Sequence, residues 1–290
     1  MREFVDLHTH STASDGQLSP QELIAHADAA GLAAIALTDH DTLAGLPAAR
    51  SAAEACPELT FVGGLEISAR FPSGTLHILA YGTDETAPSL VRITEQFRAA
   101  RNQRNPRILT NLRALDVDIE MSDVLAVAKR DSTDADERIV SRVHIAEALR
   151  RKGYVRNAQE AFDKYLGQGA AAYEDKEVIE PADAIAAIHD ADALAVLAHP
   201  IQLQYTNHAQ LERMLRDLID KGIDGIEAYH TQHSAADTRL YLDLAKRYDL
   251  GITGGSDFHG ASKPDVALGR PRVPLGAISE RFQDRLFART

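Results

Sequence analysis

The sequence predicts an α/β fold, most simply a barrel that carries a helical insertion. Seven short apolar segments have the length and composition of buried strands, and after the middle of the chain they alternate with helical patterns. This alternation is typical of parallel β/α units, which close most simply into a barrel. A chain of 290 residues is long enough for one large or two ordinary domains.

The predicted strands lie on both sides of a middle region that has few strand signals. They are residues 3–7, 33–37, 60–68, 75–81, 193–199, 224–229 and 251–256. The first helix is indicated by Ser19-Pro20-Gln21-Glu22, a capping box with proline at the first helical position, and it should end near Gly31. A second helix is expected through the forties and fifties. Residues 262–275 contain prolines and a glycine, which predicts a loop.

Residues 96–175 are predicted to form the helical insertion, over the mouth of a barrel built from 1–95 and 176–290. The insertion has helical patterns and many Arg, Asp and Ala residues. Its first part is strongly basic, because residues 96–115 hold five arginines and no acid. The arginines could form a solvated face paired with acids elsewhere, or they could clamp an anion.

Composition excludes some classes of protein. Lys+Arg total 31 and Asp+Glu total 43, a net charge of −12, which disfavours long nucleic acids as ligands. There is no tryptophan and aromatic residues are few, so no base-stacking surface is evident. The single cysteine, Cys56, cannot form an internal disulfide, and we find no signal-peptide pattern and no long apolar run. We therefore expect a cytoplasmic protein that is not inserted in a membrane and needs no obligate protein partner.

Histidine and carboxylate residues gather where the predicted strands end. They are His8, His10, Asp15, His40, Glu66, His77, His199, Asp257 and His259. The C-terminal ends of parallel barrel strands lie on one face, so these side chains should converge at one mouth. In an extended segment, two histidines separated by one residue point to the same side and can reach one metal. Any single histidine could instead be a hydrogen-bonded core residue; the metal site is indicated by the whole set.

Six segments together resemble the successive motifs of the PHP (polymerase and histidinol phosphatase) family. They are DLHTHSTASDG, LTDHD, GLEIS, LHILAYG, LAHP and GSDFHG, in the expected order between residues 6 and 260. The resemblance implies a distorted (β/α)7 barrel with a two- or three-metal phosphoesterase site. The most similar subgroup adds a helical insertion, and it contains 3′,5′-nucleotide bisphosphate phosphatases and 5′→3′ exonucleases that act on short RNA.

The same resemblance implies a role for each of the nine residues. The first metal would be held by His8, His10, Glu66 and Asp257; the second by Glu66, His77 and His199; the third by Asp15, His40 and His259. His199 and Asp257 would also act in catalysis, and Asp39 and Asp41 would orient imidazole rings. Imidazole and carboxylate ligands without cysteine suit Mn²⁺, Zn²⁺ or Fe²⁺. The family favours Mn²⁺, so we expect two to three divalent ions with manganese preferred.

Basic residues in and near the insertion are candidates for substrate binding. Arg101 and Arg104 are expected to grip a phosphate, because a guanidinium group gives paired hydrogen bonds to it. Arg142 and His144 are further candidates in a predicted helix. His230 and His233 follow the sixth predicted strand, so they should face the mouth as substrate contacts or, for His230, as a general acid.

These features favour a phosphatase that removes the 3′-phosphate of nucleoside 3′,5′-bisphosphates and leaves 5′-monophosphates. The alternatives with the same chemistry are a 5′→3′ exonuclease on short RNA or DNA and a histidinol-phosphate-type phosphatase, whose substrate lacks a second anionic group. A non-catalytic barrel tethered to a polymerase and a metal-dependent amidohydrolase are alternatives from other classes. The expected partner is a small phosphorylated nucleotide, with short oligonucleotides as an alternative.

Overall fold

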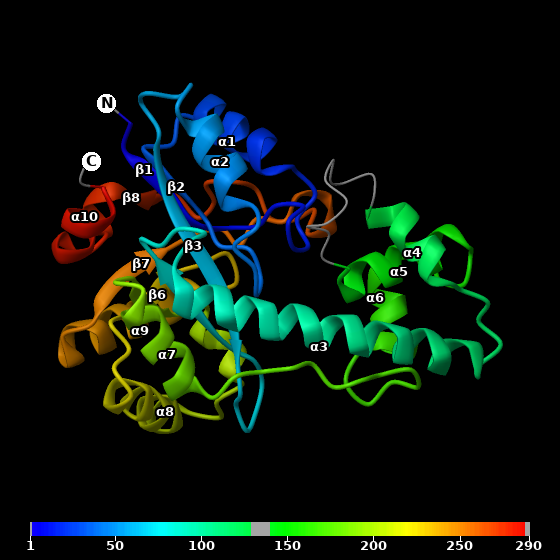
Figure 1. The fold of residues 1–290 in the computed structure, drawn as a ribbon. Helices are drawn as coiled ribbons and strands as arrows, with labels where there is room; N and C mark the ends of the chain where they lie inside the picture. Colours follow the sequence, from blue (N-terminus) through cyan, green and yellow to red (C-terminus); the bar gives the residue numbers. More distant parts are fainter. Residues whose placement is uncertain (1, 129–139, 288–290) are drawn as a thin grey trace.

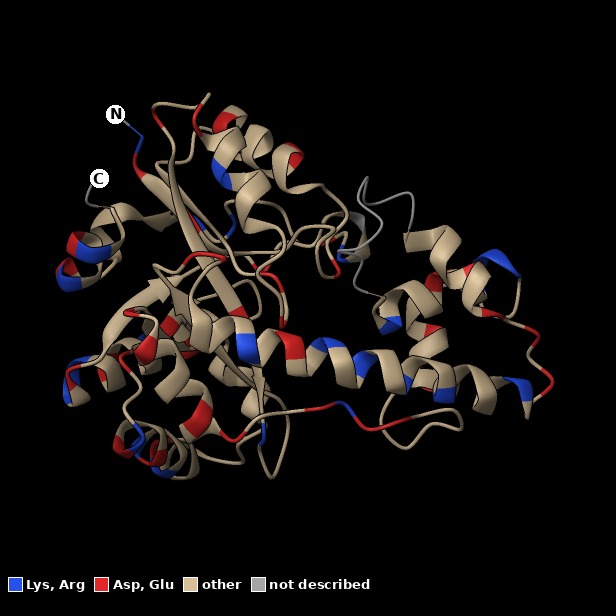
Figure 2. Ribbon diagram, viewed as in Figure 1, with Lys and Arg blue, Asp and Glu red and all other residues tan. Residues whose placement is uncertain are grey.

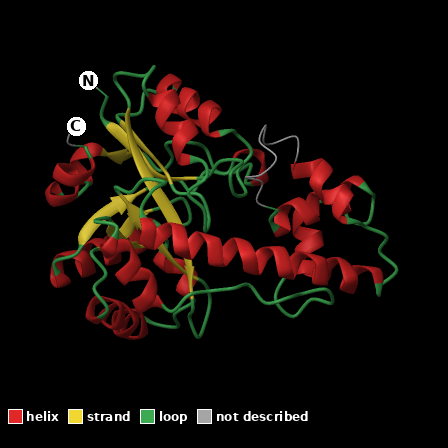
Figure 3. Cartoon of the chain, in the orientation of Figure 1, coloured by secondary structure: helices red, strands yellow, loops and turns green. Residues whose placement is uncertain are grey.

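The computed structural model describes residues 2–128 and 140–287, and they form a mixed α/β barrel with a helical extension (Figures 1 and 3). Eight strands form one sheet in the order β7-β6-β5-β4-β3-β2-β1-β8. Their bounds are β1 Phe4–Thr9, β2 Ala34–Leu37, β3 Thr60–Ala69, β4 Leu76–Tyr81, β5 Leu194–Leu197, β6 Gly225–Tyr229, β7 Gly251–Gly254 and β8 Val273–Pro274. All seven predicted strands are present, and the distorted α/β barrel is confirmed.

One strand breaks the expected parallel order. β4 runs antiparallel to both of its neighbours, β3 and β5, whereas β1–β3 and β5–β7 are parallel among themselves. The start of β4 therefore lies at the same face as the ends of its neighbours. For this reason His77, the second residue of β4, reaches the mouth from the beginning of a strand and not from its end.

The barrel closes at its mouth between β1 and the chain that follows β7. Asp257 N donates to His8 O over 2.9 Å, and His10 N donates to Phe258 O over 2.9 Å. This approach requires glycine at 255, where a Cβ atom would lie 2.4 Å from the Cβ atom and the backbone nitrogen of His8. The closure brings the first and the last of the predicted metal-ligand motifs side by side.

Helices cover the outside of the barrel. They are α1 Pro20–Ala29, α2 Leu46–Ala53, α7 Pro181–Asp190, α8 His208–Asp220, α9 Ala235–Tyr248 and α10 Glu280–Leu286. Strand residues are buried on both faces: Ile35 and Leu37 of β2 pack toward the helices, whereas Ala34 and Ala36 join a second cluster closed by Phe282 of α10. The predicted capping box of α1 is present, and Gly31 follows that helix with a φ of 73°.

The extension contains α4 Met121–Ala128, α5 Arg142–Arg151 and α6 Ala158–Ala161, followed by one π-helical turn. It is joined to the barrel by α3 Pro88–Arg113, a single helix of 26 residues (Figure 1). Phe97 of α3 packs in the barrel core, whereas Ile108 and Leu112 pack in a separate core of the extension. The predicted boundary at residue 96 thus falls inside a helix and stays a prediction.

Two further observations bear on the sequence predictions. The segment 262–275, expected to be a loop, contributes the two residues of β8, because Val273 pairs with Val5 at the edge of β1. Within the described ranges, no helix combines the length and the apolar composition needed to cross a bilayer.

Candidate metal centre and anion pocket

Glu66 lies at the centre of the predicted ligands. This residue of β3 is completely buried, and its Oε2 atom lies 3.4 Å from His8 Nε2, 3.3 Å from His10 Nε2 and 2.9 Å from His40 Nδ1. Its Oε1 atom lies 2.8 Å from His77 Nδ1 and 2.8 Å from His199 Nε2. One carboxylate therefore lies between five imidazoles, and its predicted role as a ligand shared by two metals stays a prediction.

Asp257 and Asp15 lie beside the first and the third of the predicted metal positions. Asp257 Oδ1 lies 3.3 Å from His10 Nε2 and 3.7 Å from His8 Nε2, beside the first position. Asp15 approaches His259 Nε2 at 3.3 Å and His40 Nε2 at 4.0 Å, which outlines the third position. The structure thus brings all nine side chains into one cluster at the barrel mouth, and their individual roles as ligands stay predictions.

The cluster meets a simple test for metal binding. Several buried atoms that face one another have no hydrogen-bond partner within the described residues: His8 Nε2, both ring nitrogens of His10, and Glu66 Oε2. Buried polar atoms are almost always paired, so these unpaired atoms fit a site that a cation completes. Four groups of imidazole and carboxylate atoms, including His10, Asp15, His40 and His259, are each close enough to hold one ion.

The electrostatics of the cluster also suit cations. Burial raises the pKa of Glu66, but the adjacent imidazoles of His40, His77 and His8 outweigh burial and hold it well below its usual range. Burial and the neighbouring His259 lower the pKa of His10 to about 3, and burial lowers that of His77 to about 4. Burial also acts to lower the pKa of His8 and of His40, but Glu227 and Glu66 outweigh it at His8, and Glu66 and Asp15 outweigh it at His40, so both pKa values are raised. Ionised Glu66 and neutral His10 and His77 have the protonation states that metal ligands require, whereas His8 and His40 would release a proton when a cation binds.

Two ligand positions have unusual backbone conformations. His199 has a backbone φ of 23° and Asp257 a φ of 59°, values that residues other than glycine rarely adopt. Such conformations persist only where the surrounding contacts fix them, and they gather at functional sites. Here His199 lies two residues after the end of β5, and Asp257 lies three residues after the end of β7.

His230 and His233 lie next to each other but differ in access to the centre. His230 is buried with Nε2 3.5 Å from Asp257 Oδ2, and its Nδ1 accepts a hydrogen bond from Gln232 N over 3.1 Å. The proton of neutral His230 must therefore be on Nε2, which faces the cluster. His233 lies behind it, with Nδ1 3.1 Å from Ala228 O and its ring against Tyr241. The structure thus brings only His230 to the mouth.

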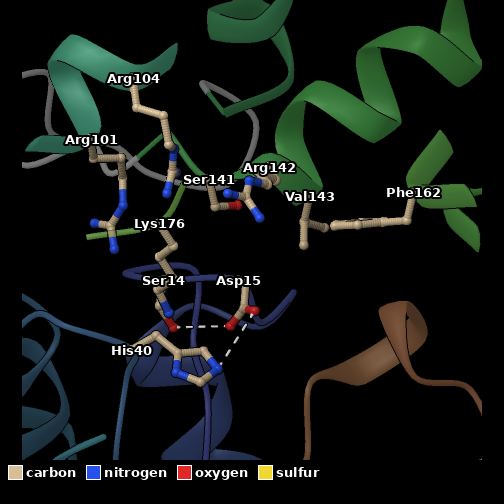
Figure 4. Close-up of a pocket in the computed structure, with 10 residues that line it drawn as sticks. All are labelled: Ser14, Asp15, His40, Arg101, Arg104, Ser141, Arg142, Val143, Phe162 and Lys176. Carbon is tan, nitrogen blue, oxygen red and sulfur yellow. Dashed lines mark hydrogen bonds and ion pairs between the residues drawn. The ribbon is translucent and has the colours of Figure 1, made fainter. Parts of the chain in front are cut away.

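The arginines of the insertion divide into two sets. Arg101 and Arg104, three residues apart on α3, point into a cavity of about 180 Å³, and Arg142 enters it from α5 (Figure 4). Asp15 and His40 line the opposite side of this cavity, so it adjoins the predicted third metal position. Arginine recurs along α3 (Figure 2), but its other arginines in the basic stretch, Arg98, Arg107 and Arg113, are exposed and do not line the cavity.

We refer to this cavity as the anion pocket. Three of its guanidinium nitrogens are buried and have no hydrogen-bond partner in residues 2–128 and 140–287: Arg101 Nη1, Arg104 Nε and Arg142 Nε. Burial lowers the pKa of Arg104 to about 10, and the positive charges of Arg142 and Arg101 add to this effect. Unpaired donors on mutually repelling cations are the features of a site that an anion completes. His144, also predicted to bind substrate, caps the start of α5 by accepting from Ser141 N over 2.9 Å and does not line the pocket.

Asp39 and Asp41 have a different function from the one predicted. Asp39 accepts hydrogen bonds from Ser11 and Ser14, and it fixes the loop that follows His10. Asp41 accepts from Ser68 N and lies 3.4 Å from Arg101 Nη2 and 3.3 Å from Lys176 Nζ. Both carboxylates therefore position loops and cations, and neither one bonds an imidazole in the described structure.

The sequence analysis missed three charged residues at the site. Glu227, in β6, is completely buried beside His8; Lys263 Nζ lies 2.6 Å from Asp257 Oδ2; and Lys176 lines the anion pocket. The carboxylate in the apolar strand DGIEAY was a usable signal for Glu227, because a charge at that position must be paired if the strand is buried. The two lysines lie in loops, where the sequence carries no comparable signal.

Comparison with known proteins places this geometry in a family. The model of the PHP domain matches residues 6–221. The chain belongs to the PHP family. The match contains seven of the nine predicted ligands, and Asp257 and His259 lie beyond it. The resemblance seen in the sequence motifs is thereby confirmed.

Three curated PHP relatives cover nearly the whole chain. A 5′-3′ exoribonuclease of Haemophilus influenzae is 34% identical over 89% of this chain and 91% of its own. A phosphoribosyl 1,2-cyclic phosphate 1,2-diphosphodiesterase of Eggerthella lenta is 33% identical, over 88% and 94%. A 3′,5′-nucleoside bisphosphate phosphatase of Chromobacterium violaceum is also 33% identical, over 88% and 87%.

A solved structure supports the same assignment. A protein of Bifidobacterium adolescentis, suggested to be a metal-dependent phosphoesterase, superposes with a TM-score of 0.85 and 31% identity over 98% of both chains. Family, relatives and cluster agree on the reaction class. This chain is a hydrolase, a metal-dependent phosphoesterase of the PHP family.

Proposed function

We propose that the enzyme removes the 3′-phosphate of nucleoside 3′,5′-bisphosphates and leaves the 5′-monophosphate. One observation carries this proposal: the anion pocket shares Asp15 and His40 with the predicted metal cluster. A substrate with two phosphates can place one on the cluster and the other among Arg101, Arg104 and Arg142. A monoester without a second anion would leave those guanidinium groups unpaired.

The residues of the chain have distinct tasks in this reaction. Divalent ions at the cluster, when bound, supply positive charge to phosphoryl oxygens and activate water for attack at neutral pH. The arginines hold the remote phosphate by charge-assisted hydrogen bonds and so fix the distance from it to the bond that breaks. His230 carries a proton at Nε2, next to Asp257, and can donate a hydrogen bond from it to the leaving ribose oxygen, which takes its proton from water.

We further propose that the resident ions are two to three manganese ions per chain. The donors are imidazole and carboxylate, which suit Mn²⁺ as well as Zn²⁺ and Fe²⁺. The single cysteine, Cys56, is not among them, so no thiolate selects a softer metal. Metal analysis of the protein as isolated tests the identity and the number of ions.

A 5′→3′ exonuclease is the second candidate, because a large groove adjoins the cluster. It has a volume of about 900 Å³, begins at Asp15 and runs beside Arg150 and Arg151 of α5. The groove has room for nucleotides beyond the cleaved bond. Its charges disfavour a polyanion, however, since both arginines are paired with Glu147, and Asp265 also lines it. For this reason we favour the mononucleotide substrate.

A panel of phosphate esters with Mn²⁺ present tests the proposal. It should contain adenosine 3′,5′-bisphosphate, the corresponding 3′-monophosphate, histidinol phosphate, a 5′-phosphorylated trinucleotide and a phosphoribosyl cyclic phosphate. We expect kcat/KM to be highest for the bisphosphate, with inorganic phosphate and the 5′-monophosphate as products. Equal turnover of the 3′-monophosphate would contradict a role for the second phosphate. Preference for the trinucleotide or the cyclic phosphate would replace the proposed substrate.

A further inference from the structure

Glu227 connects two ligands that are predicted to serve different metals. Its side chain is completely buried in β6, below the mouth. The Oε1 atom lies 3.0 Å from His8 Nδ1, and the Oε2 atom accepts a hydrogen bond from the backbone N–H of His199 over 2.7 Å. His8 belongs to the first predicted metal position and His199 to the second.

We propose that Glu227 is a positioning residue of the metal centre, which fixes the tautomer of the His8 ring and the main chain at His199. The proposal rests on the metal-dependent chemistry of the family and not on the identity of the substrate. Glu227 also lies with His8 and His230 in one of the groups whose atoms are close enough to hold an ion. The proposal assigns it no contact with an ion, because Oε2 accepts from His199 N and Oε1 faces Nδ1 of His8, the ring nitrogen opposite the one that lies near Glu66.

The contact with His8 determines which ring nitrogen is available. A carboxylate can bond Nδ1 only if that nitrogen carries a proton, and in the neutral ring Nε2 then keeps the lone pair that a metal needs. His8 Nε2 faces the cluster, 3.4 Å from Glu66 Oε2 and 3.7 Å from Asp257 Oδ1, and it has no hydrogen-bond partner among the described residues. Without Glu227, the proton could move to Nε2 and occupy the position of the metal.

The contact with His199 acts on the backbone. His199 has φ 23° and ψ 68° and is followed by Pro200, so its peptide is held in a conformation that few side chains tolerate. The hydrogen bond from His199 N to Glu227 connects the main chain at His199 to the neighbouring strand β6. With the main chain held there, the imidazole ring of His199 places Nε2 2.8 Å from Glu66 Oε1. A single carboxylate thus aligns both sides of the bridging Glu66.

The substitution Glu227→Gln removes one of the two acceptor oxygens and hardly changes the size of the side chain. A glutamine offers one acceptor oxygen and one NH₂ group, so it cannot accept hydrogen bonds from both His8 and His199. Glu227→Asp keeps two acceptor oxygens on a shorter side chain and should restore part of the function. Asp224→Asn is a matched control, because Asp224 lies just before the start of the same strand, where its Oδ2 accepts from Ala195 N over 2.7 Å and lies 3.0 Å from His189 Nε2.

Zinc titration of the metal-stripped full chain against a competing chromogenic chelator measures the effect. We expect Glu227→Gln to weaken zinc affinity about 10- to 100-fold, the usual effect of losing such a partner, with Glu227→Asp between it and the wild type. Asp224→Asn should bind zinc as the wild type does. The melting temperature in chelator should fall no further for Glu227→Gln than for Asp224→Asn. Wild-type zinc affinity in a folded Glu227→Gln protein would refute the proposal.

A measurement on the wild type keeps the proposal testable if the variants do not fold. Nitrogen-15 spectra of the zinc-loaded protein report the protonation of each histidine ring. We expect His8 to show a slowly exchanging proton on Nδ1 and a zinc-shifted Nε2. Zinc on Nδ1 of His8, or an Nδ1 without a proton, would exclude the role that we assign to Glu227.

Discussion

Replacing Arg104 by alanine should separate recognition of the remote phosphate from hydrolysis at the cluster. Arg104 is the best of the three pocket arginines for this test. Arg101 also lies 3.4 Å from Asp41, and Arg142 donates to the backbone of Glu174, so their removal would disturb loops as well. Arg104 Nη2 donates to Oδ1 of the neighbouring Asn105 over 3.4 Å, and its Nε atom is buried without a partner in the part of the chain that the structure describes.

The expected magnitude follows from these contacts. A hydrogen bond between a guanidinium group and a phosphate is worth about 1.5–3 kcal/mol, which corresponds to about 10- to 100-fold in kcat/KM. The loss should appear with adenosine 3′,5′-bisphosphate and be much smaller with an aryl phosphate, which has nothing to place in the pocket. The free energy of unfolding should not fall, because removal of Arg104 relieves repulsion from Arg101 and Arg142.

The assay compares kcat/KM for the two substrates at saturating Mn²⁺. Arg107→Ala is the matched control, since Arg107 lies three residues further along the same helix, is exposed and does not line the pocket. Arg107→Ala should leave both substrates unaffected. Equal losses for both substrates with Arg104→Ala would mean that Arg104 supports the cluster and not the remote phosphate. No loss for either substrate would refute the anion pocket.

Three further outcomes are expected. Thorough chelation should abolish turnover, and His199→Ala should lower both metal content and kcat/KM by orders of magnitude; full activity after chelation would exclude the metal centre. From the bisphosphate mononucleotide to a 5′-phosphorylated pentanucleotide, kcat/KM should fall or stay level, because the groove beyond the cluster has no excess of positive charge; a steep rise with release of successive 5′-mononucleotides would favour the exonuclease. Ser19→Ala should lower the free energy of unfolding by about 1 kcal/mol in denaturant melts, since it removes the cap of α1; kcat/KM should not change, and loss of activity without loss of stability would contradict a purely structural cap.

The sequence predicted the fold and the cluster well where local patterns carry the information. Strand candidates followed by histidine or a carboxylate identified the side chains that meet around Glu66, because strand ends in such a barrel lie on one face. His77 shows the limit of this reasoning. It reaches the cluster because β4 runs antiparallel, and strand direction depends on pairing with β3 and β5 and not on the sequence of β4 itself.

The features that were missed depend on distant parts of the chain. Glu227 stands between apolar residues in a pattern that also fits a solvent-facing strand position, and only barrel closure buries it against His8. The five arginines of the basic stretch look alike in sequence. Helix rotation and the position of α5 direct Arg101 and Arg104, but not Arg107, into the pocket. The two-residue strand β8 is stabilised by backbone pairing with β1, so its side chains give no signal.

Because α3 is one continuous helix, its length can change substrate recognition separately from the hydrolytic centre. Arg101 and Arg104 lie on the same helix that starts against the barrel at Pro88, with no loop between. Each residue inserted into an α-helix turns everything after it by about 100° and advances it by about 1.5 Å. One extra residue between Phe97 and Arg101 would turn both arginines away from the barrel mouth, while every ligand around Glu66 kept its place. A change in the length of α3 could therefore change which phosphate ester the enzyme prefers, while the hydrolytic centre stays intact.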